Sequence, residues 1–491
     1  MKRKLLYIAA AAALLFCSCS DQLFTEPEGG KVSDEQLTEL INKDADAVLA
    51  PMMQSNLMWI HNGYYNESNM YKGIKCWSLA LDLQGNDMVL TLTNNWYKDM
   101  YMLNNLRQQT SSNVAEYWYT LYKIVYRANQ ILDLMPENPS NAALIYQAQA
   151  LTYRALGYYY LMNLYQVDYM HGGKDKPGVP LHLTVGGAMG RTPSTEVYST
   201  IIADLQNAIK TFEEQGYDPM SSTADIDQSV ANMLLARIAL TSGDYSTAAS
   251  AAAAVIAEPY SLMDEEQYTT SGFQSVSLPE TIWGYTYSGT SGNGNSSFAS
   301  YVSLTVNEFS QNKGVYMAMD NRLYDQIPDT DYSKKNFLSA EQVAKGGEFE
   351  GYPQYTNIKF NTPTYEVDEV YMRLSEAYLL KAEAEARDGN DAAAQQTLYD
   401  LVSKRDSGYT KSSKTGDALL EEIYLQSRIE LWGEGHEFFT NKRFNKGIDR
   451  KSSSNHSHKV AEDVNVYTYQ IPLSIEINSN PYITSSDQNP L

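Results

Sequence analysis

The sequence predicts a mostly α-helical fold built from stacked helical hairpins. Two stretches carry this prediction, residues 231–257 and residues 376–402. In each stretch, apolar residues recur at helical spacing, stop at a glycine and then resume at the same spacing. The two glycines, Gly243 and Gly389, permit a tight turn because glycine has no Cβ atom. Each stretch is therefore expected to form one hairpin.

The two predicted hairpins also resemble each other. Leu235, Ala239, Gly243, Asp244 and Ala248 of the first stretch are matched in order by Leu380, Ala384, Gly389, Asn390 and Ala394 of the second. This echo resembles a tetratricopeptide repeat, whose hairpins bury their apolar faces only by stacking on neighbours. We therefore expect the core to be a tetratricopeptide-like helical-hairpin scaffold.

The composition indicates one large, soluble unit. The chain has 491 residues, of which 43% are hydrophobic and 20% charged. The formal net charge is −22, without a Lys/Arg cluster beyond the first four residues, and would repel a phosphate backbone, so we expect no nucleic-acid partner. Tyrosine is unusually frequent, with 39 residues against 12 Phe and 6 Trp. Because tyrosine combines an apolar ring with a polar tip, this excess favours wet surfaces that stack on flat ligands.

The first residues have the pattern of an exported protein. Positive residues 2–4 precede an apolar run over residues 5–16, which is too short to span a bilayer as a mature helix. The pattern resembles a bacterial lipoprotein signal over residues 1–18, with Cys19 as the lipidation site and residues 19–32 as a lipidated tether. Acyl chains on Cys19 would anchor the protein stably to a membrane, and secretion without a lipid is the alternative. Cys76 is then the remaining thiol, so no intrachain disulfide is expected.

Helices are expected through most of residues 33–260. Ser33 and Gln36 form a capping box that begins a helix, and this helix is expected to end at Pro51. The further expected elements are a loop with short helices over residues 59–101, long helices over residues 117–132 and 148–162, and a helix that begins at Pro193.

Helical spacing lapses over residues 261–365, where the sequence is polar, aromatic and rich in glycine. We expect an irregular, loop-rich ligand lobe here, because long insertions of this kind are usually functional. Helices resume within residues 366–445. Residues 446–491 are expected to form a C-terminal loop and strand, with the edge strand in residues 468–481. Residues 33–491 would thus form a single unit whose scaffold flanks the lobe.

Short sequence blocks follow one another in a characteristic order. They are residues 118–132, 148–165, 191–193 with Tyr198 and 204–205, 234–240 with 243–245, 279–282, 373–376 with 381–384, 428–431 with 434–435, 442–444, and 471–472 with 480–481. Together with the lipoprotein signal, these blocks resemble the SusD/RagB-like family of outer-membrane nutrient-binding lipoproteins. The resemblance covers nearly the whole mature chain.

The resemblance implies a four-hairpin tetratricopeptide-like scaffold that carries a less regular ligand lobe. Members of the family are surface-exposed lids on SusC-like TonB-dependent transporters and capture oligosaccharides or other nutrients. His436 and Thr440 stand where the family usually has Arg and Asp, which puts an ion pair there in doubt. Asp21 alone supplies acidity after Cys19, so the family's acidic surface-export signal is weak in this chain.

Candidate ligand-binding residues combine exposed aromatics with amides, because sugar rings offer flat C–H faces and hydroxyl groups. Asn94, Asn95 and Trp96 have that chemistry in the early loop. Similar family members also place stacking aromatics in the middle insertion, which nominates Tyr285, Tyr287, Tyr301 and Tyr316. The alternative for each aromatic is packing against the scaffold, and that is our interpretation of Trp283.

Catalytic motifs have little support in the sequence. His436 and Glu437 begin like a zinc-protease helix, but Thr440 stands at the position of the second histidine. His456 and His458 in a serine-rich loop could hold a metal, although such residues are more often solvated. We therefore expect no enzyme activity, no cofactor and no metal. Three charged residues on one predicted helix face are interpreted as structural: Arg428, Glu430 and Glu434.

The function expected from these observations is nutrient capture at the outer membrane. The chain would be a lipid-anchored, surface-exposed protein that binds an oligosaccharide or polysaccharide and passes it to a SusC-like TonB-dependent transporter. Two alternatives stay open. The ligand could be a peptide or another non-carbohydrate nutrient with the same transporter, or the chain could be a helical assembly adaptor without a small ligand.

Overall fold

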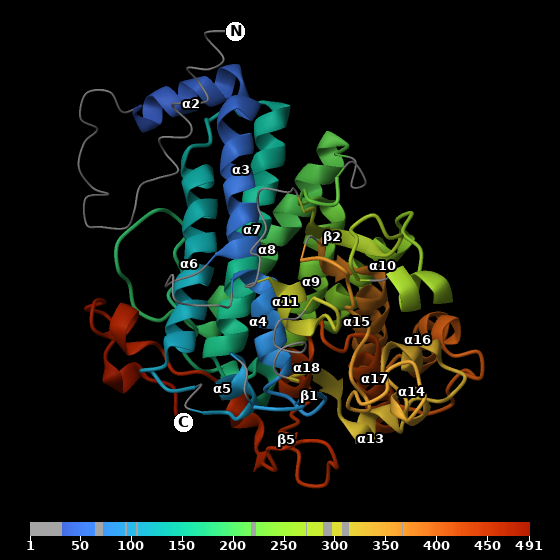
Figure 1. Cartoon of the computed structure of the whole chain (residues 1–491). Coiled ribbons are helices and arrows are strands. Elements are labelled where there is room, and N and C mark those ends of the chain that lie inside the picture. The colour runs from blue at the N-terminus through green and yellow to red at the C-terminus, as the bar shows by residue number, and fades with distance from the viewer. Residues whose placement is uncertain are drawn as a thin grey trace.

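The computed structural model confirms a mostly α-helical fold (Figure 1). It describes residues 32–63, 72–93, 96–104, 107–217, 222–271, 273–287, 297–306, 314–365 and 367–491. Among these residues, no helix combines the length and the apolar character that crossing a bilayer requires. The lipidation site predicted at Cys19 lies outside the described residues.

The first helices break at an aspartate instead of a proline. Helix α2 (Asp34–Lys43) begins with the predicted capping box, in which the Ser33 and Gln36 side chains each bond the other's backbone N–H. The chain then leaves helical geometry at Asp44, whose carboxylate accepts the Ala47 N–H at 3.2 Å and caps helix α3 (Ala45–Asn62). The prediction that one helix continues to Pro51 is therefore wrong, since Pro51 lies inside α3.

Within the described residues, eight helices follow one another in the scaffold, and each packs against the next. They are α6 (Ser112–Asp133), α7 (Asn141–Tyr165), α8 (Ser194–Gln215), α9 (Gln228–Ser242), α10 (Tyr245–Ala257), α15 (Leu374–Arg387), α16 (Asp391–Arg405) and α17 (Gly416–Glu430). Helix α10 packs against α15, although the ligand lobe separates them in the sequence. The two predicted hairpins are thereby stacked, as the tetratricopeptide-like pattern requires.

Both predicted hairpin turns are confirmed. Gly243 ends α9 with φ = 81°, and Gly389 lies between α15 and α16 with φ = 80°. This left-handed conformation favours glycine because other residues carry a Cβ atom.

Tyrosines are a major part of the buried core, which corrects the interpretation of the tyrosine excess as surface chemistry. The largest side chains that are almost fully buried include Tyr97, Tyr101, Tyr117, Tyr158, Tyr165, Tyr268, Tyr301, Tyr467 and Tyr469. Several hydroxyls reach internal acceptors, such as Tyr97 to the Cys76 carbonyl oxygen at 3.1 Å and Tyr469 to the Gln84 side chain at 2.8 Å. A buried tyrosine is acceptable when its hydroxyl is bonded in this way.

The remaining elements are short. Before the scaffold come α4 (Gly73–Asp82), β1 (Met88–Leu90) and α5 (Lys98–Tyr101). In and beside the lobe are η3 (Gln267–Ser271), β2 (Thr281–Tyr285), α11 (Phe298–Val302), β3 (Met317–Met319), α13 (Asn321–Tyr324), η5 (Tyr332–Asn336), α14 (Ala340–Val343) and β4 (Glu369–Arg373). The described strands pair as antiparallel ribbons, β1 with β3, β2 with β4, and β5 (Ile448–Asp449) with β6 (Ala461–Glu462).

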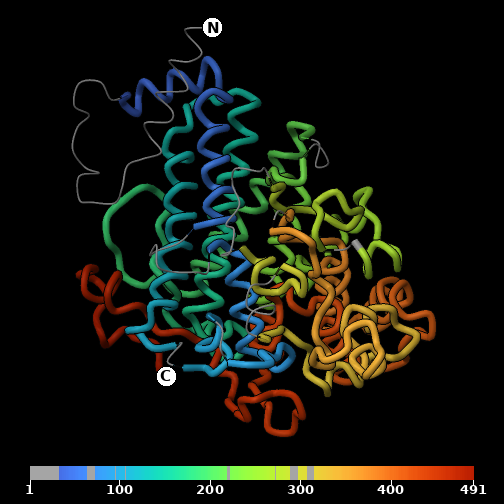
Figure 2. Tube along the Cα trace, in the orientation of Figure 1, coloured from blue at the N-terminus to red at the C-terminus, as the bar shows by residue number. Residues whose placement is uncertain are grey.

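The C-terminal segment wraps back onto the scaffold. Its elements after β6 are η6 (Val464–Tyr467), η7 (Leu473–Ile477) and η8 (Ser485–Asp487), and α18 (Glu437–Arg443) precedes β5. In Figure 2 this red segment lies at the end of the molecule opposite α2, beside the lower end of α6. Residues 468–481 form no strand: Tyr469 N–H donates to the Leu164 carbonyl oxygen at 2.8 Å, and η7 follows. The predicted edge strand there is wrong, and the predicted docked loop is present.

Candidate functional site

The site begins with the ribbon of β1 and β3, which joins the early loop to the lobe. Met88, Val89 and Leu90 pair with Met319, Ala318 and Met317, and all of these side chains are buried. A further segment extends the ribbon, because Met319 N–H donates to the Tyr355 carbonyl oxygen at 3.0 Å. Apolar strands covered on all sides make a firm support for the residues at the two ends of the ribbon.

One end of the ribbon carries exposed apolar and aromatic side chains. The pairing continues by one residue, since Thr91 N–H donates to the Tyr316 carbonyl oxygen at 3.0 Å and Tyr316 N–H donates to Thr91 Oγ1 at 2.8 Å. Just beyond it, Leu92 and Trp96 each keep 51% of their surface exposed. The partly exposed Tyr316 ring lies 5.3 Å from that of Tyr352.

Phe349 extends this surface, because its ring centroid lies 6.1 Å from that of Tyr352 and it is partly exposed as well. We call Leu92, Trp96, Tyr316, Phe349 and Tyr352 the aromatic shelf. The rings of Tyr316, Tyr352 and Phe349 form one contact series, and Leu92 and Trp96 belong to the shelf as the half-exposed apolar residues that follow β1. Contiguous exposed apolar groups mark binding surfaces, whereas single exposed apolar residues need no explanation. Flat rings with polar neighbours can stack on the C–H face of a sugar.

The residue that follows Trp96 is buried in the core. This residue, Tyr97, is fully buried, and its ring packs edge-on against Tyr301 at 4.8 Å between centroids. Its hydroxyl donates to the Cys76 carbonyl oxygen of α4. The backbone that presents Trp96 is therefore held by core packing, which reduces the ordering cost of binding.

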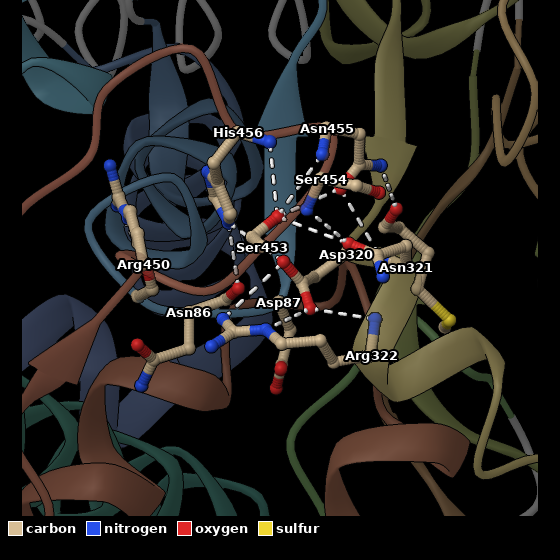
Figure 3. A network of polar contacts seen from close by, with 12 residues as sticks. Asn86, Asp87, Asp320, Asn321, Arg322, Arg450, Ser453, Ser454, Asn455 and His456 are labelled. Atoms are coloured by element: carbon tan, nitrogen blue, oxygen red, sulfur yellow. Dashed lines mark hydrogen bonds and ion pairs between the residues drawn. The ribbon is translucent and has the colours of Figure 1, made fainter.

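The opposite end of the ribbon is a buried polar network, which we call the base network (Figure 3). Asn86 and Asp87 precede β1, Asp320 follows β3, and a C-terminal loop over residues 450–456 lies against them. Asp320 N–H donates to the Asp87 carbonyl oxygen at 2.8 Å, which closes the ribbon. Asn455 Nδ2 donates to the Met319 carbonyl oxygen at 2.8 Å and joins the loop to β3.

His456 lies within the base network and is not solvated, contrary to the interpretation of its loop. Its Nε2 is 2.8 Å from the Asn86 carbonyl oxygen, and its Nδ1 is 2.9 Å from the Tyr101 hydroxyl. The hydrogen bonds assign the neutral tautomer, in which Nε2–H donates to Asn86 and Tyr101 O–H donates to Nδ1. Burial and the nearby Arg450 lower the pKa of His456 to about 3, although Asp320 lies 3.5 Å away.

The predicted ligand residues fall into different environments. Trp96 and Tyr316 belong to the aromatic shelf, and Tyr287 is half-buried after β2 with its N–H donating to Asp368 Oδ1 at 2.9 Å. Asn94 and Asn95 lie outside the described residues. Three members of the shelf were not predicted from the sequence: Leu92, Phe349 and Tyr352.

Two of the residues predicted to be ligand platforms are buried instead of exposed. Tyr285 is buried in β2, where its ring stacks on His61 at 3.8 Å, and Tyr301 is buried against Tyr97. Neither ring offers an open face, because core contacts cover both. Trp283 is buried as expected. A hydrophobic run such as the one around β2 indicates burial, and it could have separated Tyr285 from the exposed aromatics.

A buried ion cluster joins the lobe to the scaffold. Arg373 contacts Glu280 at 3.0 Å, Glu430 at 2.6 Å and Glu434 at 2.7 Å, and Arg405 contacts Glu280 and Glu430. Burial alone would raise the pKa of Glu430, but the two arginines outweigh it and lower that pKa to about 2. The structural interpretation of Glu430 and Glu434 is confirmed, as is that of Arg428, which pairs with Asp87 at 2.5 Å. Paired carboxylates of this kind stay ionised and are poor proton donors.

Asp82 and Glu437 are among the carboxylates whose pKa values are raised, as those of catalytic acids are. Burial raises the pKa of Asp82 to about 7, and burial with nearby Asp87 raises the pKa of Glu437. Both accept backbone N–H groups: Asp82 from Gly435 at 2.8 Å, and Glu437 from Asp87 at 3.1 Å. The cavity beside them has a volume of only about 10 Å³, which holds no more than a water molecule. These groups therefore close the structure around α18 and have no room for a substrate.

The histidines raise two separate questions: whether side chains are arranged to hold a metal ion, and whether His436 forms an ion pair. Among the residues that the structure describes, no group of three or more His, Cys, Asp or Glu side chains is arranged to hold a metal ion. His436 lies 3.6 Å from Glu376, whose main partner is Arg237 at 2.6 Å. Burial lowers the pKa of His436 to about 4, so it is a neutral neighbour of this pair near neutral pH.

Comparison with protein families identifies two related models on this chain. Residues 82–240 match a SusD-like model described as starch-binding and associating with the outer membrane, and residues 274–490 match the SusD family model. Two curated relatives come from Formosa agariphila. SusD-like protein P2 is 28% identical over 271 residues, which cover 51% of this chain and 50% of that protein. SusD-like protein P25 is 23% identical over 438 residues, which cover 76% and 79%.

Thus the chain spans about half the length of the first relative and most of the second. Solved structures share the fold. A SusD-like carbohydrate binding protein from Bacteroides vulgatus superimposes with a TM-score of 0.76 at 21% identity, covering 90% of this chain and 98% of that one. Surface glycan-binding protein A from Bacteroides thetaiotaomicron, in complex with laminarihexaose, has a TM-score of 0.65 at 16% identity, covering 88% and 97%.

Proposed function

Because this chain belongs to the SusD/RagB-like family, we propose that it is a non-enzymatic surface lipoprotein that captures a glycan on the aromatic shelf. In this proposal it delivers the glycan to a SusC-like TonB-dependent transporter in the outer membrane. The observation that carries the proposal is the shelf itself, which presents Leu92 and Trp96 half-exposed in the segment that follows β1 of the buried ribbon.

The shelf has the chemistry of a sugar platform. Trp96 and Tyr316 supply ring faces, and Thr91 supplies a hydroxyl beside them. Asn94 and Asn95, from the same loop, are proposed to add amide donors and acceptors. A relative of the same fold was solved with laminarihexaose bound, which supports a glycan over the peptide alternative.

Binding by the shelf alone should be weak. Aromatic contacts contribute about 0.5–1.5 kcal/mol each, so three platforms supply about 2–4 kcal/mol, which corresponds to millimolar dissociation constants. Useful capture therefore requires further hydrogen bonds, a multivalent polysaccharide or closure onto a transporter.

Localisation and partnership rest on two further observations. The matched family model is described as associating with the outer membrane. The leader over residues 1–18 has lipoprotein character, and acylation of Cys19 would attach the chain to the membrane. Replacing Cys19 by Ala is expected to move the protein from the membrane fraction to the soluble fraction.

The direct test is affinity electrophoresis and isothermal titration of residues 20–491 against a panel of polysaccharides. The parent should bind at least one of them, and Trp96→Ala should weaken that binding about tenfold. Tyr482→Ala is the matched control, since Tyr482 is 65% exposed elsewhere on the surface. Equal binding by Trp96→Ala and the parent would remove the shelf from the proposal, and turnover of a glycan by the purified protein would contradict a non-enzymatic role.

A further inference from the structure

Helix α6 presents an unusual outward face. Tyr119, Tyr122, Lys123 and Tyr126 follow one another at intervals of three, one and three residues, which places them on one side of the helix. All four are partly exposed. The outward face of a scaffold helix is normally charged, so three tyrosines there indicate a surface that contacts something else.

This face forms one wall of a pocket with a volume of about 300 Å³. Trp118, Tyr119, Tyr122 and Tyr126 line it from α6, His182, Thr184 and Gly186 line it from the loop before α8, and Ile475 and Glu476 line it from η7. The volume reaches the lower end of the range for small-ligand sites, about 300–1,000 Å³. None of these residues belongs to the aromatic shelf.

Other concave sites fit a ligand less well. Two have volumes of about 10 and 20 Å³, which excludes anything larger than water. A third, between α3 and α7, has about 260 Å³. Its lining combines seven apolar side chains with two glutamines, three tyrosines and two aspartates, Asp46 and Asp225. Because no Lys or Arg lines it, this site is negatively charged and suits a neutral ligand less well than a charge-balanced pocket.

The walls of the α6 pocket are fixed by hydrogen bonds. Trp118 Nε1 donates to Glu476 Oε2 at 3.0 Å, and Asn480 Nδ2 donates to Glu476 Oε1 at 2.5 Å. The Tyr122 hydroxyl donates to the Pro180 carbonyl oxygen at 2.8 Å and ties α6 to the neighbouring loop. Three separate segments of the chain therefore hold the pocket open in a defined shape, so little ordering cost would be left for binding.

The polar groups of the pocket balance in charge. The Lys123 ammonium lies 5.8 Å and 5.1 Å from the ring centroids of Tyr119 and Tyr126, and Glu476 lines the same pocket from η7. The His182 and Tyr122 rings lie edge-on, with 5.7 Å between their centroids. Burial lowers the pKa of His182, which keeps this side chain neutral near neutral pH. One positive and one negative group leave the pocket without a net preference for an ionic ligand.

We propose that this pocket is a second saccharide-binding site, which takes a neutral pyranose unit. The rings of Tyr122 and Tyr126 would stack on its C–H face, while Lys123 and the remaining lone pairs of Glu476 would bond its hydroxyls. The proposal extends the glycan capture proposed above to the helical scaffold. Two separated sites on one chain would let a polysaccharide bind at two points, so its overall affinity would exceed that of either site alone.

The test is isothermal titration of the mature chain with neutral hexasaccharides: laminarihexaose, maltohexaose, xylohexaose and mannohexaose. Four variants are compared with the parent: Tyr126→Ala, its matched control Tyr126→Phe, Lys123→Met, and Trp96→Ala from the shelf. Tyr126 is chosen because Tyr122→Ala would also release the loop at Pro180. Circular dichroism and thermal melting verify that each variant folds.

Tyr126→Ala should weaken binding of the recognised hexasaccharide about three- to tenfold, which is the factor that one aromatic contact supplies. Tyr126→Phe should bind like the parent. Loss in both Tyr126→Ala and Trp96→Ala supports two sites, and loss in Tyr126→Ala alone supports the pocket while removing the shelf.

Loss in Trp96→Ala alone, with Tyr126→Ala and Lys123→Met equal to the parent, overturns the pocket and leaves the proposed function in place. If the parent binds none of the four hexasaccharides, the neutral-saccharide pocket is overturned, whereas the proposed function is overturned only if the parent also binds none of the polysaccharides in the panel. A hexagalacturonate that binds the pocket more tightly than every neutral probe would overturn the assignment of a neutral sugar.

Discussion

The two ends of the β1–β3 ribbon differ in burial: one end buries polar side chains, and the other exposes apolar side chains. At the base network, Asp320, Arg450 and His456 are buried and bonded, whereas at the aromatic shelf, Leu92 and Trp96 are half-exposed. Globular proteins usually bury apolar side chains and expose charged ones. The reversal indicates a division of roles along one ribbon: the base holds the structure in place and the shelf is available to a ligand.

The physical reason for the division is that the two ends lower the stability of the fold in different ways. A buried polar group destabilises the fold unless its partners are present, so the base must be fully bonded. An exposed apolar group loses the benefit of burial, so it is retained where a ligand covers it. Mutations at the base should therefore act mainly on stability, and mutations at the shelf mainly on binding.

The largest effect is expected at Arg450. Its guanidinium donates to the backbone carbonyl oxygens of Leu83, Gly85 and Tyr101 at 2.6–2.8 Å, and the side chain is fully buried. Arg450→Met leaves those carbonyl groups without a donor and should lower the free energy of unfolding by about 3–5 kcal/mol. Urea denaturation measures this change in the free energy of unfolding. Lys451→Met, at the exposed neighbour, is the control, and a loss below about 1 kcal/mol for Arg450→Met would contradict the role of the base.

The next effect depends on pH and comes from His456. In the folded protein its pKa is lowered to about 3, so it stays neutral, whereas the unfolded chain binds a proton below about pH 6.5. Folding stability from this residue is therefore complete above pH 6.5 and declines as the pH falls towards 3. Between pH 7 and pH 5 the decline is about 2 kcal/mol.

The groups that face His456 support this direction. Arg450 and Arg322 disfavour its positive charge, whereas Asp320 favours it and is outweighed by burial. The measurement is the difference in free energy of unfolding between the parent and His456→Gln at pH 7 and at pH 5. His458→Gln, from the same loop, should show a smaller pH dependence. A difference that does not change with pH would mean that His456 is accessible to protons in the folded state.

At the shelf, Trp96→Ala should separate binding from stability. Because Trp96 is half-exposed, its loss should change the free energy of unfolding by less than about 0.5 kcal/mol, while glycan affinity falls about tenfold. Urea denaturation and titration of the same preparation measure both. If Trp96→Ala destabilised the protein as much as Arg450→Met, the contrast between the two ends would fail.

The smallest effect is expected at Tyr316. Tyr316→Ala removes a ring that packs against Tyr352 and should weaken glycan binding about threefold, whereas Tyr316→Phe keeps the ring and should bind like the parent. Titration of the two variants side by side tests whether the ring or the hydroxyl matters. Weakening by Tyr316→Phe would assign the contact to the hydroxyl.

The fold was largely predictable because its signals are local. Helical spacing and the positive φ angles of Gly243 and Gly389 depend on residues close together in the sequence, and both hairpins appear as expected. The break at Asp44 was missed because a proline is the stronger local signal, although α3 accommodates Pro51. The missing strand in residues 468–481 reflects backbone hydrogen bonds to residues 107 and 109 and to α7, and a side-chain bond to α6, which no local pattern records.

The candidate site was predictable only in part. Trp96 is exposed and Tyr316 partly exposed, as a ligand platform requires, but Tyr285 and Tyr301, which are aromatic as well, are buried. Composition identifies an aromatic residue, whereas exposure depends on which neighbours cover it. The α6 pocket and the base network were missed for the same reason, since each joins segments hundreds of residues apart.

The sequence by itself determined the helical hairpins, their turns, the family and the presence of an irregular lobe, because periodicity and ordered blocks are written along the chain. Tertiary structure alone decided which aromatics face solvent, where His456 lies and how Arg373 joins lobe to scaffold. The reason is that burial and hydrogen-bond partners are set by distant segments meeting in space. A tyrosine in the core and a tyrosine on the shelf therefore look alike until the chain is folded.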